Sequence, residues 1–182
     1  MSWSNVILID SKSFTCGYCS NLVASSIGYR FGSSELKIYI CPHCSNPTFF
    51  NERIQLPGVS PGNAIENLPV DIESLYNETR KCVAASCYTA AVLLCRKLLM
   101  NIGVAQGANT GESFIKYVEY LSDKGFVPPN GKGWVDHIRK KGNEANHEIV
   151  LMSKTDADEL ILFIEMLLKF IYEFPNKIPI IK

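Results

Sequence analysis

Two C-x2-C pairs contain the residues whose types and spacing point most directly to chemistry. The pairs are Cys16-Gly17-Tyr18-Cys19 and Cys41-Pro42-His43-Cys44, with residues 20–40 between them. Together they supply four thiolates, which complete a tetrahedral zinc site with Zn–S bonds of about 2.3 Å. The sequence therefore predicts one structural Zn²⁺ per chain, with Cys16, Cys19, Cys41 and Cys44 as its ligands.

Disulfides are the alternative use of paired cysteines. The chain has seven cysteines, an odd number, and its first residues, Met-Ser-Trp-Ser-Asn, do not have the charged start and cleavage site of a secretory signal peptide. Both observations favour zinc and a cytoplasmic location. His43 is expected to be an exposed loop residue, because four thiolates already fill the coordination shell. The remaining cysteines, Cys82, Cys87 and Cys95, are expected to be small apolar core residues.

Short β-rich runs surround the two pairs and must bring them together. Val6–Ile9 is predicted to be a strand, and Ile27–Phe31 and Leu36–Ile40 are predicted to form a hairpin around Gly32-Ser33-Ser34. A segment this small buries too little apolar surface to fold alone, so metal binding is expected to supply much of its folding free energy. Residues 1–56 are therefore predicted to be a zinc ribbon with a leading strand.

Helical periodicity follows a segment, residues 57–68, that is rich in proline and glycine and is predicted to be a linker. Apolar residues then recur at helical spacing from residue 69 to residue 175, which predicts a helical bundle. Residues 176–182 are left as a C-terminal tail. The predicted fold class is α+β, mainly α, with a small N-terminal β zinc ribbon followed by a four- to five-helix bundle.

The last helix of this bundle is predicted to begin near Ser153 or Thr155 and to end at Pro175. Glu165, Lys169 and Glu173 fall four residues apart in it, and the other positions are almost all apolar. The pattern predicts one narrow polar stripe that faces water. Such a helix is either the centre of the bundle or part of a dimer interface.

Charge and hydropathy limit the classes of function. The formal net charge is zero, which excludes a protein whose whole surface attracts nucleic acid. The most apolar run, residues 160–172, contains Glu165 and Lys169 and is too short to span a bilayer, so no membrane partner is expected. One local basic patch stands out, and it is either a binding surface or a solvated helix face: Lys132, Arg139, Lys140 and Lys141.

Three segments of the helical half carry a family resemblance. They are LYNETRKC at residues 75–82, YTAA at residues 88–91 followed by Arg96, and WVDHIRKKGNEANH at residues 134–147. This half resembles domain-of-unknown-function family 4145, which is similar to the HEPN helical bundles. The resemblance implies a four- or five-helix HEPN-like bundle that forms a homodimer. It also implies a prokaryotic or phage context of nucleic acids and defence.

Active HEPN proteins are metal-independent ribonucleases, and the resemblance implies candidate catalytic residues here. A histidine can act as general acid and base on a ribose 2′-OH, and an arginine can hold the phosphate. Arg139 and His147, with Asn143 between them, are the candidates. In one continuous helix these three side chains would share a face; if the helix breaks at Gly142, Asn143 is instead an N-cap and His147 seals the core.

Arg96 lies among leucines on a helix that is expected to be buried. A buried arginine needs a partner, which would be a phosphate or nucleotide, or an internal carboxylate such as Glu78 or Glu144. Arg96, Lys140 and Lys141 are therefore the candidate ligand-binding residues.

The sequence as a whole favours a zinc-binding interaction or regulatory protein with a protein or RNA partner. One alternative is a HEPN-type endoribonuclease that acts through His147 and Arg139. The other is a sensor of a nucleotide or small ligand, which would need a groove near Arg96. The chain has no Walker loop, Rossmann fingerprint or nucleophile elbow.

Overall fold

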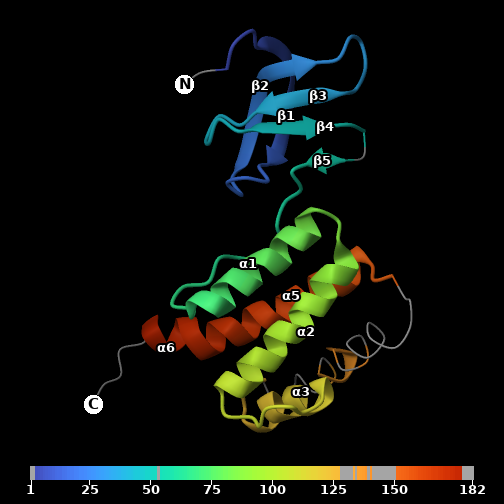
Figure 1. The fold of residues 1–182 in the computed structure, drawn as a ribbon. Helices are drawn as coiled ribbons and strands as arrows, with labels where there is room; N and C mark the ends of the chain where they lie inside the picture. Colours follow the sequence, from blue (N-terminus) through green and yellow to red (C-terminus); the bar gives the residue numbers. More distant parts are fainter. Residues whose placement is uncertain are drawn as a thin grey trace. The chain divides into compact units, whose positions relative to one another are not determined.

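The fold is described from a computed structural model, which defines residues 3–52, 54–127, 133, 135–138, 140 and 151–177. The chain divides into two compact units, Met1–Ser60 and Pro61–Lys182. The first is built on a β-sheet and the second on helices (Figure 1). This architecture confirms the predicted α+β fold class.

The first unit is one antiparallel sheet in which neighbouring strands are also neighbours in sequence, in the order β1-β2-β3-β4-β5. The strands are β1 (Ile7–Thr15), β2 (Leu22–Arg30), β3 (Lys37–Ile40), β4 (Pro47–Phe50) and β5 (Gln55–Leu56). The predicted hairpin is confirmed, because Tyr29 pairs with Ile38 and Arg30 with Lys37. The sequence does not predict β4 and β5, which are short; β4 begins at Pro47, and Pro57 directly follows β5.

Three aromatic rings form the core of the sheet unit. Phe14, Tyr39 and Phe50 come from three strands, and their ring centroids lie 5.1–6.1 Å apart in tilted and edge-to-face arrangements. Such offset geometries are favourable for aromatic pairs. Cys16 and Cys41 are buried in the same cluster, so the aromatic core supports the cysteines directly.

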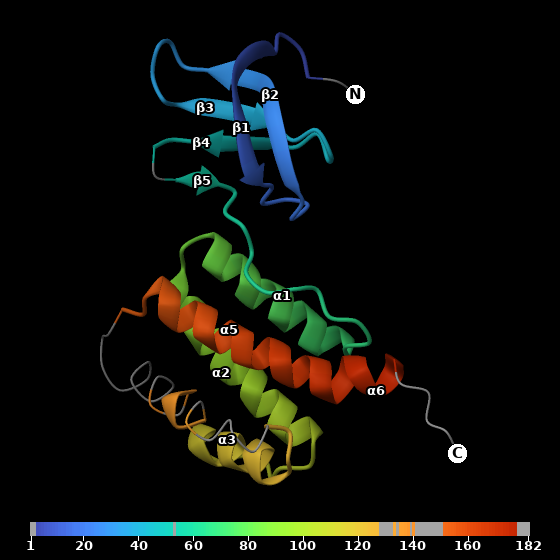
Figure 2. The ribbon, with the colours of Figure 1, turned by 180° about the vertical axis from the view of Figure 1, so that it is seen from behind.

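The second unit packs its helices around a single apolar core. Its helices are α1 (Val70–Ala84), α2 (Tyr88–Ala105), α3 (Phe114–Asp123), α5 (Lys154–Leu168) and α6 (Phe174–Lys177), with a π-helical turn at Lys169–Glu173 between the last two. Helix α2 contacts α1, α3 and α5 (Figure 2). Residues 133, 135–138 and 140 are also helical.

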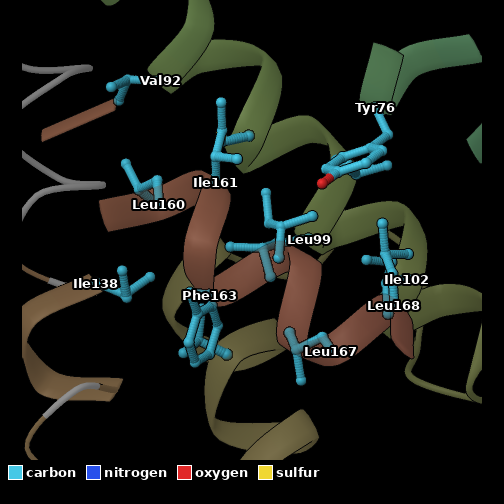
Figure 3. Packing of buried hydrophobic residues seen from close by; sticks show 14 of the residues in the cluster. Tyr76, Val92, Leu99, Ile102, Ile138, Leu160, Ile161, Phe163, Leu167 and Leu168 are labelled. Carbon is cyan, nitrogen blue, oxygen red and sulfur yellow. The ribbon is translucent and has the colours of Figure 1, made fainter. Parts of the chain in front are cut away.

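The core of the helical unit has the helix periodicity that the sequence predicts. In α1 the buried residues are Ile72, Tyr76, Thr79 and Val83, three or four apart on one side. Tyr76 of α1 and Leu99 of α2 face residues of α5 such as Ile161 and Leu168 (Figure 3). Ile138 joins the same cluster, so the segment that contains it also packs on the core.

Helix α2 is the one described helix whose length and composition alone would suit a membrane span. Its mean hydropathy is 1.3 over 18 residues, and 44% of them are buried inside the protein. Contacts with three other helices account for this apolar character.

Helix α5 begins as predicted, and Ser153 caps it. The Ser153 hydroxyl accepts a hydrogen bond from the Asp156 N–H at 3.2 Å, and the Asp156 carboxylate accepts one from the Ser153 N–H at 2.9 Å. This is a reciprocal capping box, which satisfies N–H groups that the helix itself leaves unpaired.

The predicted end of this helix is wrong, because α6 continues through Pro175. Proline has no N–H to donate. The chain accommodates it with the preceding π-helical turn, in which the Phe174 N–H donates to the Lys169 carbonyl, five residues back. The helical direction is therefore kept without the hydrogen bond that Pro175 cannot make.

The predicted water-facing polar stripe of α5 is also wrong. Glu165 and Glu173 are only 6% and 7% exposed. The Glu165 carboxylate accepts hydrogen bonds from the N–H and the side-chain amide of Asn63, and the Glu173 carboxylate accepts one from the Glu66 N–H. The two acids therefore hold residues 63–66 against the helix instead of facing solvent.

Residues 61–68, inside the segment predicted to be a linker, are thus part of the helical unit. Ile65 of this segment is buried in the core, and Arg80 of α1 donates to the carbonyls of Pro61 and Gly62 at 2.7 and 2.9 Å. Gly62 has φ +69°, and a Cβ there would lie 2.8 Å from the Glu165 carboxylate. Only glycine fits this close approach without strain.

Candidate metal centre

The two C-x2-C pairs fold into two turns with the same backbone hydrogen bonds. The Cys16 N–H donates to the Asn21 carbonyl at 2.9 Å and the Ser20 N–H to the Cys16 carbonyl at 2.8 Å. In the second turn, the Cys41 N–H donates to Asn46 and the Ser45 N–H to Cys41, again at 2.9 and 2.8 Å. Ser20 and Ser45 both have positive φ, 57° and 60°. The site is therefore built from two copies of one local structure.

The four sulfur atoms that these turns present have the spacing of a tetrahedral metal site. All four Sγ atoms lie within 4.8 Å of one another, and the Sγ distances are 3.7 Å for Cys16–Cys44 and 3.8 Å for Cys19–Cys41. A tetrahedron of thiolates with metal–sulfur bonds of about 2.3 Å has S–S edges of about 3.8 Å. The four residues predicted as ligands thus come together and fit one metal ion. None of the four forms a disulfide.

The surroundings of Cys16 and Cys19, the two cysteines of the first turn, shift the pKa values of their thiols in opposite directions. Burial raises the pKa of the Cys16 thiol to about 11. Hydrogen bonds from the backbone and side chain of Asn21 lower the pKa of Cys19 to about 6. Because a metal binds thiolates, its binding must displace the Cys16 proton, whereas Cys19 is already favourable for coordination.

Asn21 and Asn46 are site residues that the sequence analysis missed. Asn46 donates from its amide to the Cys44 sulfur at 3.5 Å, and the Asn21 amide lies 3.2 Å from the His43 ring. His43 is exposed, as predicted. A signal for both asparagines exists in the sequence, because each cysteine pair is followed directly by Ser-Asn.

Gly17 lets the chain after β5 pack against the first turn. A Cβ at Gly17 would lie 2.4 Å from the Pro57 carbonyl and 2.6 Å from the Gly58 carbonyl. The Gln55 side chain reinforces this contact by donating to the Thr15 carbonyl at 2.7 Å and the Pro57 carbonyl at 3.3 Å. The first cysteine turn is therefore held in place by the residues at and after β5.

The sheet face that points away from the aromatic core is apolar and open. Register places Tyr29, Ile38, Phe49 and Leu56 directly opposite one another on four strands, so their side chains share that face. Phe31, 75% exposed, continues it beyond β2. A hollow of about 360 Å³ lies among these side chains, bordered by Arg30 and Lys37. We call this the outer sheet face: Tyr29, Phe31, Leu36, Ile38, Phe49 and Leu56.

Arg96 is buried in the helical unit, 8% exposed. Its guanidinium lies 4.3 Å from the ring centroid of Phe114, a cation–π contact. Among the described residues, its Nη1 has no hydrogen-bond partner and no carboxylate pairs with it; Glu78 does not, and Glu144 lies outside them. Burial lowers the pKa of Arg96.

The other candidate residues are not brought into a described site. Arg139, Asn143, His147 and Lys141 lie outside the described residues, and Lys132 of the basic patch does too. Lys140 is exposed. The Nε2 atom of the neighbouring His137 lies at hydrogen-bond distance, 2.6 Å, from the Glu159 carboxylate of α5, which is a structural role.

The fold and site define an α+β protein with a cluster of four cysteines, able to hold a metal ion, in a small sheet unit and with a separate helical unit. The family profile described as Domain of unknown function (DUF4145) matches residues 77–182, more than half of the chain and most of the helical unit. The chain belongs to this family. No curated protein and no solved structure matches it significantly.

Proposed function

We propose that Cys16, Cys19, Cys41 and Cys44 hold one structural zinc ion, which makes the first unit a zinc ribbon. Four thiolates are a soft ligand set that suits zinc, and they leave no coordination position for water or substrate. When bound, the ion supplies a tetrahedral crosslink. The paired turns and the aromatic core of Phe14, Tyr39 and Phe50 orient the cysteines for it.

The ribbon serves, in this proposal, as an interaction module for a protein partner. The observation that carries this function is the outer sheet face, where side chains such as Phe31 and Leu56 are exposed. Contiguous exposed apolar surface is typical of protein–protein interaction sites. Residues 1–60 contain four basic and three acidic residues, and Lys37 is paired with Asp10 and Glu35. So weak a positive charge favours a protein over RNA as the partner.

The helical unit, on this proposal, is a HEPN-like bundle that associates with a second copy of the chain. The role is regulatory, in a prokaryotic or phage context of nucleic acids or defence. Membership of the DUF4145 family and the motifs of residues 75–82, 88–91 and 134–147 support it. A cytoplasmic location is part of the same proposal.

The experiment uses the metal-loaded full chain to capture proteins, which are then identified, purified and titrated against it. Phe31→Ser and Leu56→Ser, on the outer sheet face, should each weaken binding at least about tenfold. Leu151→Ser, at an exposed position of the helical unit, is the control and should leave binding unchanged. A partner whose affinity is insensitive to both outer-face variants would contradict the proposal.

A parallel arm tests the ribonuclease alternative. End-labelled RNA is incubated with the same protein in magnesium-free buffer, with His147→Ala and Arg139→Ala beside the wild type. We expect no cleavage. Cleavage that both substitutions abolish would replace the interaction function with that of a HEPN-type ribonuclease.

A further inference from the structure

Two cysteines outside the four-cysteine cluster lie at the connection between α1 and α2. Cys82, near the end of α1, is half-buried and packs against the core. Cys87, directly before α2, is exposed, so the prediction that it is a core residue is wrong. Cys95, the third cysteine of the helical unit, is fully buried, as predicted. An exposed thiol close to a second thiol is the arrangement that reversible oxidation requires.

The turn that joins the two helices brings these cysteines together. The Cys87 N–H donates to the Cys82 carbonyl at 2.8 Å, and the Ser86 N–H donates to the Val83 carbonyl at 2.9 Å. Ser86 has φ +61°, which reverses the chain directly after the helix. These features define a Schellman motif, in which the side chains of the two residues joined by the outer hydrogen bond commonly make contact. Those two residues are Cys82 and Cys87.

The spacing of the two backbones suits a disulfide. Standard bond lengths and the 2.8 Å hydrogen bond place the Cα atoms of Cys82 and Cys87 no more than about 6 Å apart. Disulfides join residues whose Cα atoms lie about 4.4–6.8 Å apart. The two side chains also interact electrostatically, because burial raises the pKa of Cys82 and the nearby Cys87 thiol raises it further.

We propose that Cys82 and Cys87 form a reversible disulfide when the protein meets a hydroperoxide. Cys87 is the cysteine that reacts first, because thiol oxidation follows exposure, and Cys82 is the resolving cysteine. The Cys87 thiol donates weakly to the Ala85 carbonyl at 3.7 Å, so it must rotate away from this contact to form the bond. The disulfide ties the end of α1 to the start of α2, and both cysteines lie in the helical unit, so the proposal is independent of the metal and of any partner.

The reaction has two steps. The Cys87 thiolate attacks one oxygen of hydrogen peroxide, the O–O bond breaks, and Cys87 becomes a sulfenic acid while hydroxide leaves. The Cys82 thiolate then attacks the Cys87 sulfur, so that the S–S bond forms, the S–O bond breaks and a second hydroxide leaves. In total, two thiols lose two electrons and two protons, and the peroxide is reduced to two water molecules. Exchange with a thiol such as glutathione reverses the modification.

The test treats the metal-loaded full chain with hydrogen peroxide, added in steps up to an excess. Free thiols are then blocked by alkylation, and the chain is cleaved after Lys81 by trypsin and after Tyr88 by chymotrypsin. The resulting fragment, residues 82–88, contains Cys82 and Cys87 and no other cysteine. After oxidation, mass spectrometry should find it unalkylated and about 2 Da lighter than the same fragment with two free thiols.

Substitutions assign the role of each cysteine. In Cys82→Ser, Cys87 should remain a sulfenic acid that dimedone traps, whereas in Cys87→Ser, Cys82 should stay available for alkylation. Cys95→Ala changes the buried cysteine and is the control, in which the 82–88 disulfide should form as in the wild type. Circular dichroism verifies that all three variants are folded. The proposal would be overturned by a wild-type chain in which both cysteines are still alkylated after excess peroxide, or in which Cys87 becomes a sulfinic acid while Cys82 stays free.

A second measurement tests whether the folded turn brings the cysteines together. The Cys82–Cys87 disulfide is equilibrated with reduced and oxidised glutathione, once in the native chain and once in concentrated urea, and the 82–88 fragment is analysed in the same way. The equilibrium constant for disulfide formation should be at least about tenfold larger in the native chain, because the Schellman motif holds the two residues close. A constant that is equal or smaller in the native chain would overturn the role of the turn.

Discussion

Glu165 receives two hydrogen bonds from Asn63, one from the backbone N–H at 3.1 Å and one from the side-chain amide at 2.8 Å. The same carboxylate forms an ion pair with Lys169. The carbonyl of Asn63 accepts in turn from the Tyr76 hydroxyl at 3.1 Å. One buried acid thus links the segment before α1 to α5, and α1 is tied to the same segment.

Glu165→Ala should lower the unfolding free energy of the helical unit by about 2–3 kcal/mol. The substitution removes the buried carboxylate that accepts two partly buried hydrogen bonds from Asn63 and pairs with Lys169. Glu73→Gln, at an exposed position of α1, is the control and should change stability by less than about 0.5 kcal/mol. Urea unfolding followed by helical circular dichroism measures both; equal stabilities would contradict the role of Glu165.

The helical unit should lose stability in acid. Burial acts to raise the pKa of Glu165, but hydrogen bonds from Asn63 and Lys169 outweigh it and hold that pKa below the ordinary value of 4.5. Lys177 and the Glu66 N–H lower the pKa of Glu173 in the same way. A carboxylate with a lower pKa in the folded state stabilises the fold above the unfolded pKa, and this stabilisation is lost as the pH falls through the folded value.

The decline should therefore begin near pH 4.5 and continue below it. The variant with both Glu165→Gln and Glu173→Gln should be less stable at neutral pH and should decline less steeply in acid. Unfolding at a series of pH values measures the two slopes. Identical slopes would show that other groups control the acid response.

Metal removal should unfold the sheet unit and leave the helical unit folded. The sheet unit has a small aromatic core around the cysteines, whereas the helical unit has a separate apolar core. Chelation, or Cys41→Ser, should collapse the dispersed amide signals of residues 3–60 in NMR spectra and spare those of α1, α2 and α5. Cys87→Ser changes an exposed cysteine and is the matched control.

Elemental analysis identifies the bound ion, and the absorption spectrum of the cobalt-substituted protein identifies its ligands. We expect one zinc per chain by elemental analysis, and a cobalt-substituted protein with intense tetrahedral d–d bands and thiolate charge-transfer bands. A chain that keeps a dispersed β-sheet spectrum without any metal would contradict the structural role of the ion.

Gly17→Ala should weaken metal binding, because the added methyl group cannot fit between the first turn and the carbonyls of residues 57 and 58. Competition with a chromophoric chelator measures the affinity, and we expect a loss of at least about tenfold. At Gly133 a Cβ would meet nothing within 4 Å, so Gly133→Ala is the control. An unchanged affinity in Gly17→Ala would show that the turn can move away from residues 57 and 58.

The sequence predicts best the features that are local along the chain. The four cysteines come together as expected because each pair is a short turn whose geometry residues such as Ser20 and Asn21 complete. The stripe of Ile72, Tyr76 and Val83 likewise follows from helix periodicity alone. In both cases the residues that decide the structure lie within a few positions of one another.

Features that depend on distant residues were not predictable in this way. Glu165 has a charged residue four positions away, as a solvent-exposed acid would, and only the return of residues 63–66 to α5 makes it a buried acceptor. Arg96 was expected to pair with an anion, but the described structure gives it the ring of Phe114. Pro175 interrupts the hydrogen-bond pattern, and a π-helical turn absorbs the interruption.

The tie between Glu165 and Asn63 determines where the helical unit can be cut out as an independent fragment. A fragment that starts at Val70, the first residue of α1, would remove Ile65 from the core and strip Glu165 and Glu173 of their backbone donors. A fragment that starts at Pro61 keeps all of these contacts. Limited proteolysis from the N-terminal side should accordingly remove residues only up to residue 60. On expression, the fragment that starts at Val70 should aggregate, whereas the fragment that starts at Pro61 should not.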